Sequence, residues 1–286
     1  MAVEQPGSLS GPPGGVRGDE RTDSRGLTAA LVMDGVGFVR DRRPILADVC
    51  WQVADGQRWV VLGANGSGKT TLLRIAALYE HPTTGTVEVL GRRLGQVDVR
   101  RLRHRVGFVS PSLAQMLRPH VRAAEVVMTA RHGALEPWWH DYTDDDRERA
   151  EGLLEQVGAG GLGDRTIATL SSGERQRVQL ARSLMTDPGL VLLDEPASTL
   201  DLGGREMLVG DLTRLATDAS APPLVLVTHR PEEIPEGFTH VLLLREGRVL
   251  AQGPLATELT SETLSACFGL GLSLEHRNGR WYAHAR

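Results

Sequence analysis

The stretch from Gly63 to Thr71, which reads GANGSGKTT, constrains the fold of this chain more than any other. An apolar run, Arg58 to Leu62, precedes it, and a helical pattern of apolar residues, Thr71 to Leu78, follows it. In the order strand, glycine loop, helix, the pattern G-x-x-x-x-G-K-[ST] forms a phosphate-binding P-loop. A glycine-rich turn with a chance lysine would lack this setting, so we predict a nucleoside triphosphate site.

The residue types of the P-loop suit phosphate binding. Its glycines can adopt backbone angles closed to residues with a Cβ, so successive N–H groups turn inward and form an anion-binding nest. The helix that follows points the positive end of its dipole at the same place. We expect Lys69 to reach the β and γ phosphates and the Thr70 hydroxyl to be a ligand of Mg²⁺. The expected nucleotide-binding residues are Gly63, Ala64, Asn65, Gly66, Ser67, Gly68, Lys69, Thr70 and Thr71.

Composition and charge narrow the class of protein. With 286 residues, of which 41% are hydrophobic and 24% charged, the chain can form one or two globular domains with ample core. The net charge of -4 argues against a basic nucleic-acid-binding surface, so no direct nucleic acid partner is expected. We interpret the arginines between residues 100 and 105 as a solvated helix face. The sequence contains no run of 18 apolar residues, so we predict no membrane span.

The cysteines and the N-terminus bear on the compartment. Cys50 and Cys267 both have apolar neighbours, so we predict that both are buried, and two such residues indicate neither a disulfide framework nor a zinc site. This usage suits a reducing, cytosolic compartment. Residues 1–26 are rich in Gly, Pro and charge and lack the apolar core of a signal peptide, so they predict a disordered tail.

The rest of the chain alternates strand and helix signals. Short strands at residues 30–33, 48–54 and 86–90 predict a small antiparallel sheet beside the nucleotide. Residues 112–170 read as helical, with a helix start at the acidic run 144–146. Trp138 and Trp139 are more typical of core packing than of a partner contact. A helix at 262–268 and a hairpin at Asn278-Gly279 are expected near the end.

Two further strands end in polar residues. The apolar strand that begins at Leu190 delivers Asp194 and Glu195 at its carboxyl end, where ligands sit in open α/β sheets. Asp194 suits a second ligand of Mg²⁺, and Glu195 can accept a proton from an attacking water. A strand over residues 224–228 ends at His229, which on its own is more often structural than catalytic.

Together these motifs resemble one family, the nucleotide-binding subunits of ATP-binding cassette (ABC) proteins. GANGSGKT resembles the Walker A motif, and LVLLDEP resembles Walker B with its following glutamate. LSSGE, residues 170–174, is similar to the signature LSGGQ, the run 198–201 to the D-loop, and Thr228-His229 to the switch histidine.

The resemblance implies a fold and a domain organisation. The expected fold is an α/β P-loop NTPase with a RecA-like parallel-sheet core, an antiparallel β subdomain and an inserted α-helical subdomain. The ABC ATP-binding domain would span residues 27–260, with the helical subdomain at about 112–170 and a short C-terminal extension at 261–286.

The resemblance also implies a mechanism built on a dimer. A second copy, or a homologous ATPase subunit, would meet the chain head to tail, so that each ATP lies between one P-loop and the other signature. Ser171 and Gly173 would contact the γ-phosphate bound by the partner's Lys69, with Asp201 of the D-loop at the same site. Glu195 would position the water, His229 would contact the γ-phosphate, and Asp194 would hold Mg²⁺.

Two positions depart from the family pattern. Arg40 stands where an aromatic residue usually stacks on adenine, and a guanidinium plane can also stack on a base. Pro111 stands where a glutamine usually touches Mg²⁺, and Gln115 would replace it only if the loop were shifted. The serine-rich run at 110–112 weakly resembles that of molybdate-uptake ATPases.

The leading hypothesis is the ATPase subunit of an ABC transporter. It would be cytoplasmic and peripheral, bound at the inner face of the cell membrane to a separate transmembrane permease through residues 112–170. The alternative is a soluble, non-transport ABC ATPase that acts on nucleic acid or ribosomes. A small-molecule kinase leaves LSSGE unexplained, and an ATP-gated scaffold that does not hydrolyse ATP would need Glu195 to be inactive.

Overall fold

The computed structural model of the chain describes residues 29–137 and 140–286. The predicted tail at residues 1–26 and the prediction for Trp138 and Trp139 lie outside the described residues. Within the described ranges, no helix combines the length and the apolar character that a membrane span needs.

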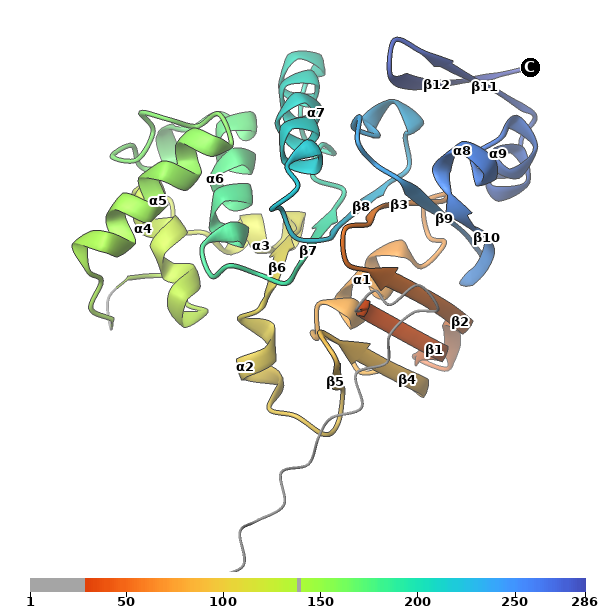
Figure 1. The fold of residues 1–286 in the computed structure, drawn as a ribbon, viewed down its shortest axis with the longest axis horizontal. Helices are drawn as coiled ribbons and strands as arrows, with labels where there is room; N and C mark the ends of the chain where they lie inside the picture. Colours follow the sequence, from red (N-terminus) through yellow and green to blue (C-terminus); the bar gives the residue numbers. More distant parts are fainter. Residues whose placement is uncertain (1–28, 138–139) are drawn as a thin grey trace, which may run out of the picture.

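A six-stranded sheet forms the centre of the molecule, in the order β10-β9-β3-β8-β7-β6 (Figure 1). Its strands are β3 (Arg58–Leu62), β6 (Val106–Val109), β7 (Leu190–Asp194), β8 (Leu224–Thr228), β9 (His240–Arg245) and β10 (Arg248–Pro254). All neighbours are parallel except β9 and β10. Every residue of β3, β7 and β8 is buried, because both faces of the sheet are covered.

A second sheet of four antiparallel strands lies beside the first, as predicted, in the order β2-β1-β4-β5. Its strands are β1 (Ala29–Arg40), β2 (Arg43–Ala54), β4 (Thr84–Val89) and β5 (Arg92–Arg93). The predicted short strands at 30–33 and 48–54 were wrong in length, since β1 and β2 each have 12 residues. Pairing of β1 with both β2 and β4 extends it, and register shifts bend it near Gly35, whose φ is +59°.

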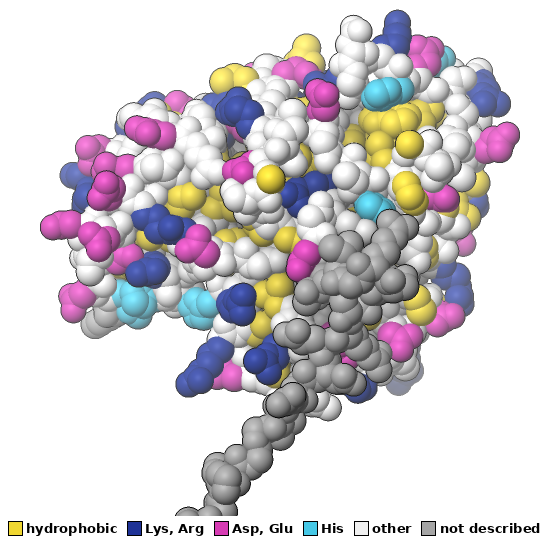
Figure 2. Space-filling model, viewed as in Figure 1, with side chains coloured by type: hydrophobic (Ala, Val, Ile, Leu, Met, Phe, Trp, Pro, Cys, Tyr) yellow, Lys and Arg dark blue, Asp and Glu magenta, His cyan; other side chains and the backbone are white. Residues whose placement is uncertain are grey.

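Residues 112–170 contain helices and no named strand in their described part, in agreement with the prediction of a helical segment, and turns and irregular backbone connect the helices. The elements are α3 (Pro111–Met116), α4 (Ala123–Met128), the 3₁₀ turn η1 (Thr129–His132), α5 (Asp144–Gln156) and η2 (Ile167–Thr169). The predicted acidic helix start is confirmed, and Thr143 caps it by accepting a hydrogen bond from the Asp146 N–H at 3.2 Å. Charged side chains of both signs cover the outer side of this segment (Figure 2).

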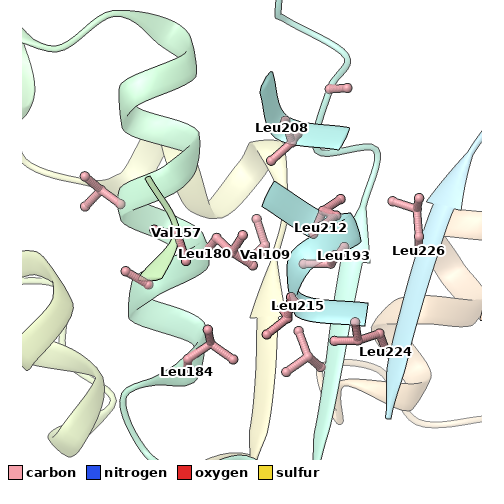
Figure 3. Packing of buried hydrophobic residues seen from close by; sticks show 14 of the residues in the cluster. Val109, Val157, Leu180, Leu184, Leu193, Leu208, Leu212, Leu215, Leu224 and Leu226 are labelled. Atoms are coloured by element: carbon pink, nitrogen blue, oxygen red, sulfur yellow. The ribbon is translucent and has the colours of Figure 1, made fainter. Parts of the chain in front are cut away.

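Helices cover both faces of the central sheet. They are α1 (Lys69–Ala76), α2 (Val99–Arg103), α6 (Ser172–Leu184), α7 (Leu202–Thr217), α8 (Leu255–Glu258) and α9 (Ser261–Phe268), with the 3₁₀ turn η3 (Pro231–Glu233). Alternate strand residues serve two separate cores: Leu193 packs with α6 and α7, and Leu192 with α1 and the antiparallel sheet. Figure 3 shows Leu193 among Leu180, Leu212 and Leu215 of those helices.

The predicted turns are confirmed, and one burial prediction was wrong. Asn278-Gly279 joins β11 (Leu272–Arg277) to β12 (Arg280–Ala285), with φ of +51° and +73° at the two turn residues. Cys267 is buried as predicted, but Cys50 is exposed, because strand alternation places it on the face opposite Trp51.

Candidate active site

The P-loop runs from the end of β3 into α1 and has the backbone conformation that a nest requires. Gly66 and Gly68 have φ of +80° and +103°, in the left-handed region. A Cβ on Gly68 would lie 2.8 Å from Leu46 Cδ2, and one on Gly63 would lie 2.3 Å from the Leu244 carbonyl oxygen. Close packing therefore requires glycine at Gly63 and Gly68. Gly66 lies on the open side of the loop, where an added Cβ would have no atom within 4 Å.

Lys69 is the single lysine of the chain, and its side chain lies across the P-loop. Its Nζ donates hydrogen bonds to the carbonyl oxygens of Gly63 at 2.9 Å and Ala64 at 3.1 Å, and lies 3.6 Å from Glu195 Oε1. Burial lowers the pKa of Lys69, and the carboxylate of Glu195 partly offsets this. The ammonium group is thus held beside the loop with one carboxylate near it.

Thr70 and Asp194 are adjacent, as a shared metal site requires. Thr70 Oγ1 donates to Asp194 Oδ1 at 3.2 Å, and the Asp194 side chain is buried. Burial raises the pKa of Asp194 to about 6, so a nearby cation would favour its charged form. Mg²⁺ commonly takes one or two carboxylates together with hydroxyl, phosphate and water oxygens. The two side chains therefore fit this ion.

Glu195 and His229 extend from neighbouring strands, β7 and β8, toward the same place. His229 Nδ1 lies 3.5 Å from Glu195 Oε1, a spacing and orientation that do not make a hydrogen bond. Glu195 has a φ of +45°, which is strained for a residue with a Cβ, and its N–H is fixed to the Val227 carbonyl at 3.0 Å. The structure thus brings Glu195, His229 and Lys69 together.

Thr228 fixes the chain next to His229 by bonding to Glu233, a residue that the sequence analysis did not identify. Its buried hydroxyl donates to Glu233 Oε2 and accepts from the Arg230 N–H at 3.1 Å. Glu233 is itself buried. Nothing in the run Pro231-Glu-Glu233 distinguishes this glutamate from an exposed one, because its partner lies on the preceding strand.

The signature residues form a capping box at the start of α6. Ser171 Oγ accepts from the Glu174 N–H at 3.2 Å, and Glu174 Oε2 accepts from the Ser171 N–H at 2.7 Å. Arg165 pairs with the other carboxylate oxygen at 3.1 Å. The Ser171 N–H is the main cause of the lowered pKa of Glu174, with the Arg165 charge contributing. Glutamate at this position is therefore well accommodated.

Two residues on α6 and α7 hold the signature and the D-loop together. The buried Arg177 and Asp211 pair at 2.7 Å. Asp201 caps α7 by accepting from the Gly204 N–H at 2.7 Å, and a Cβ on Gly173 would lie 3.8 Å from Gly204 Cα. Ser171 and Asp201 thus begin two clamped helices, and in the described part of the chain neither forms a hydrogen bond to the P-loop.

Arg40 lies at the end of β1, with its guanidinium 5.3 Å from the centre of the Phe38 ring. Its Nη2 donates to Glu80 Oε1 at 2.7 Å, so the side chain is held by its own fold. One face of the guanidinium is thereby occupied, and the adenine contact stays a prediction.

Pro111 is the first residue of a helix and does not form part of an irregular loop. Ser110 caps α3 by accepting from the Leu113 N–H at 3.2 Å, and proline is favoured at the first helical position. Gln115 lies within α3, where a helix fixes its position.

Comparison with known proteins places these motifs in one family. A family model described as "ABC transporter" matches residues 46–198. The uncharacterized ABC transporter ATP-binding protein YlmA of Bacillus subtilis is 40% identical over 239 residues, which cover 83% of this chain and 90% of YlmA. YmeB of Lactococcus lactis, also an uncharacterized ABC transporter ATP-binding protein, is 36% identical over 233 residues, covering 82% and 90%.

The fold agrees with this result. The dimeric structure of the ATP-binding cassette MJ0796, in a post-hydrolysis state bound to ADP and Pi, superposes with a TM-score of 0.68 at 24% identity, covering 79% of this chain and 98% of that one. The antiparallel sheet, the parallel core and the helical insertion are those of a cassette. The chain belongs to the ABC transporter family, as an ATP-binding subunit that hydrolyses ATP for transport.

Proposed function

We propose that two copies of this chain close head to tail on two ATP molecules and reopen after hydrolysis. The observation that carries the proposal is the placement of Ser171. It caps a helix of 13 residues, whose N-terminus suits an anion, yet in the described chain its hydroxyl and its N–H bond to Glu174 of the same helix. A triphosphate on the P-loop of a second copy would give this helix end a ligand. The MJ0796 cassette is itself described as a dimer with ADP and Pi.

Within each site, the residues have distinct roles. Lys69 binds the β and γ phosphates, and Thr70 and Asp194 hold Mg²⁺, which neutralises phosphate charge when it is bound. Glu195 orients the attacking water and accepts its proton, and His229 contacts the γ-phosphate. Ser171, Gly173 and Asp201 of the second copy complete the site. The strained backbone of Glu195 supports its role, since such strain collects at functional positions.

The variant Glu195→Gln tests the dimer. It should bind ATP, hydrolyse it about a hundredfold more slowly, and accumulate as a dimer, because the amide cannot accept the proton of water. Size-exclusion chromatography with light scattering, with and without ATP, measures the mass of the particle and so distinguishes monomer from dimer. Glu151→Gln changes an exposed glutamate on α5 and should behave as the wild type. A Glu195→Gln chain that stays monomeric at saturating ATP, or that hydrolyses at full rate, would contradict the proposal.

We propose that the membrane permease docks in a groove beside the helical segment. The groove has a volume of about 480 Å³ and lies between α2, β6, α3, η1 and α6. Apolar side chains in it include Phe108 and Met116, and its lining carries cationic groups but no carboxylate. Figure 2 shows hydrophobic side chains exposed among Lys and Arg side chains near α2. Such a surface suits a permease segment with apolar anchors and acidic ends.

The variant Met116→Asp tests this docking, since Met116 lines the groove, is 55% exposed and is not one of the proposed nucleotide-site residues. It should lose co-purification with the permease while keeping basal ATP hydrolysis. Asp187→Asn, on another face, is the control. Release of the wild-type chain into the soluble fraction with bound RNA would instead favour the alternative of a soluble, non-transport ATPase.

Relatives with similar sequence identity to this chain are named for different cargoes. Relatives at 36% and 33% identity are named for sulfate/thiosulfate import in Caulobacter vibrioides and for phosphonates import in Ruegeria. The serine-rich run at 110–112, which prompted the molybdate comparison, is explained here by the cap of α3. We propose that the permease selects the cargo and holds this chain at the cytoplasmic face of the membrane.

A further inference from the structure

One arginine of the C-terminal hairpin bridges two separate segments of the cassette body. Arg280, the first residue of β12, forms a two-pronged ion pair with Glu206 of α7, at 2.8 Å for Nη1 and 3.3 Å for Nη2. Nη2 also donates to the Glu232 carbonyl in η3 at 2.5 Å. A second strand residue, Ala283, donates its N–H to Glu232 Oε1 at 3.1 Å. Figure 1 shows the hairpin beside α7 and the connection from β8 to β9.

The two segments that Arg280 joins each follow a proposed site residue. Glu206 lies on α7, in the second turn after the cap residue Asp201. Glu232 lies in η3, which begins two residues after His229. The hairpin therefore links α7, which follows the D-loop, to η3, which follows the switch histidine. The link is the Arg280 side chain, which is only 21% exposed.

The position of His229 is sensitive to such a restraint. Its Nδ1 stands 3.5 Å from Glu195 Oε1 without a hydrogen bond, so its own side chain does not hold it in place. The restraints act on its chain neighbours: the side chains of Thr228 and Glu233 bond to each other on one side, and Arg280 and Ala283 of the hairpin bond to Glu232 on the other. A small displacement of a group that contacts a reacting phosphate lowers the rate strongly.

We propose that Arg280 is a positioning residue for ATP hydrolysis, which holds His229 against the D-loop helix from outside the nucleotide site. This rests on the proposed roles of His229 and Asp201. Because α7 begins at the surface where the second copy would meet the chain, the same contact transmits closure of the dimer to His229. The binding of ATP to the P-loop does not pass through this contact.

The variant Arg280→Ala in the full-length chain tests the proposal. We expect kcat for ATP hydrolysis to fall about fivefold, as for one partly exposed bidentate pair, with the KM for ATP unchanged. Arg280→Lys should recover only part of the rate, because an ammonium cannot form the fork. Arg277→Ala is the matched control: Arg277 faces Arg280 across the same hairpin but pairs with Glu275 and lies over the Tyr282 ring.

The decisive measurement combines Arg280→Ala with His229→Ala in single-turnover hydrolysis. If Arg280 acts through His229, the double variant should hydrolyse ATP no more slowly than His229→Ala alone, so that Arg280→Ala adds no further loss once His229 is absent. An undiminished further loss, or a wild-type kcat for Arg280→Ala, would overturn the inference. A fall in melting temperature without a fall in kcat would also overturn it, since it would reduce Arg280 to a structural role. Glu206→Gln, which removes the ion pair from the other side, repeats the test if Arg280→Ala does not fold.

Failure of this inference is distinguishable from failure of the proposed function. If Glu195→Gln forms the ATP-dependent dimer and His229→Ala is slow, but Arg280→Ala keeps its kcat, only the role of Arg280 is wrong. Full turnover by both Glu195→Gln and His229→Ala would instead remove the mechanism on which that role depends.

Discussion

The P-loop and the signature helix differ in how complete each is within one chain. Around Lys69, the groups that would act on the phosphates are buried or half-buried and contact one another from three neighbouring strand ends. At Ser171, the described contacts are those of an ordinary helix start, with Glu174 and Arg165 close by. In the proposed mechanism, one half of the nucleotide site is thus assembled by folding, and a second copy supplies the other half.

This difference separates two kinds of effect. Substitutions at the P-loop should remove nucleotide binding by a single copy, and with it hydrolysis by the dimer. Substitutions at the signature should leave nucleotide binding by one copy intact and act on the dimer. Loss of nucleotide binding by a single signature variant, or normal nucleotide binding by a P-loop variant, would break this distinction.

The largest effect is expected for Lys69→Ala. Loss of the cation from the nest should lower kcat/KM for ATP by at least about a hundredfold, as for removal of a preorganised electrostatic group. Lys69→Arg should recover little, because the planar guanidinium does not fit a nest shaped for a point charge. Steady-state hydrolysis and calorimetric ATP binding measure both. Full activity in Lys69→Ala would contradict the assignment of the P-loop.

Ser171→Ala should have an intermediate effect with two separable parts. Loss of the cap should lower the free energy of unfolding by about 1 kcal/mol, measured by thermal denaturation. Loss of the hydroxyl should also weaken the ATP-dependent dimer, with ATP binding to a single copy unchanged. Thr143→Ala removes an equivalent cap from α5 and is the matched control. If both variants dimerise equally well, Ser171 has only the structural role.

The smallest effect is expected for Glu174→Gln. Glutamine can keep the capping box but loses the pair with Arg165, which is worth about 0.5 kcal/mol at this exposure. The folded-state pKa of Glu174 is lowered from its ordinary value of 4.5, so its charged form stabilises the native state above that pH. The stability advantage of the wild type at pH 7 should therefore vanish as the pH falls through the lowered pKa. An advantage that grows in acid would contradict the sign of this shift.

The sequence predicts best where one local signal decides the structure. The bounds of β8 follow from a continuous apolar run, because that strand is buried on both faces. The hairpin at Asn278-Gly279 follows from a turn that needs two left-handed residues. The P-loop follows from its glycines and flanking elements.

Prediction from the sequence fails where a residue's contact partner is distant in the chain or where the helix signal is weak. The length of β1 depends on pairing with β4, and the fate of Arg40 depends on Glu80, 40 residues away. The helix α7 was not predicted: Gly203 and Gly204 weaken the helix signal at its start, although Leu208, Leu212 and Leu215 keep helical spacing. The contacts of Glu233 and Arg280 have no local signature, since each is made by tertiary packing.

Mixing two variants that each impair a different half of the site tests the central claim most directly. Lys69→Ala lacks a working P-loop, and Ser171→Ala has a weakened signature, so a head-to-tail dimer of one copy of each contains one intact site and one doubly defective site. Random pairing should restore about a quarter of wild-type hydrolysis, since half of the dimers are mixed and each has one of two sites. Activity that rises to this level on mixing is the predicted result. A mixture no more active than the sum of its parts would contradict the shared site.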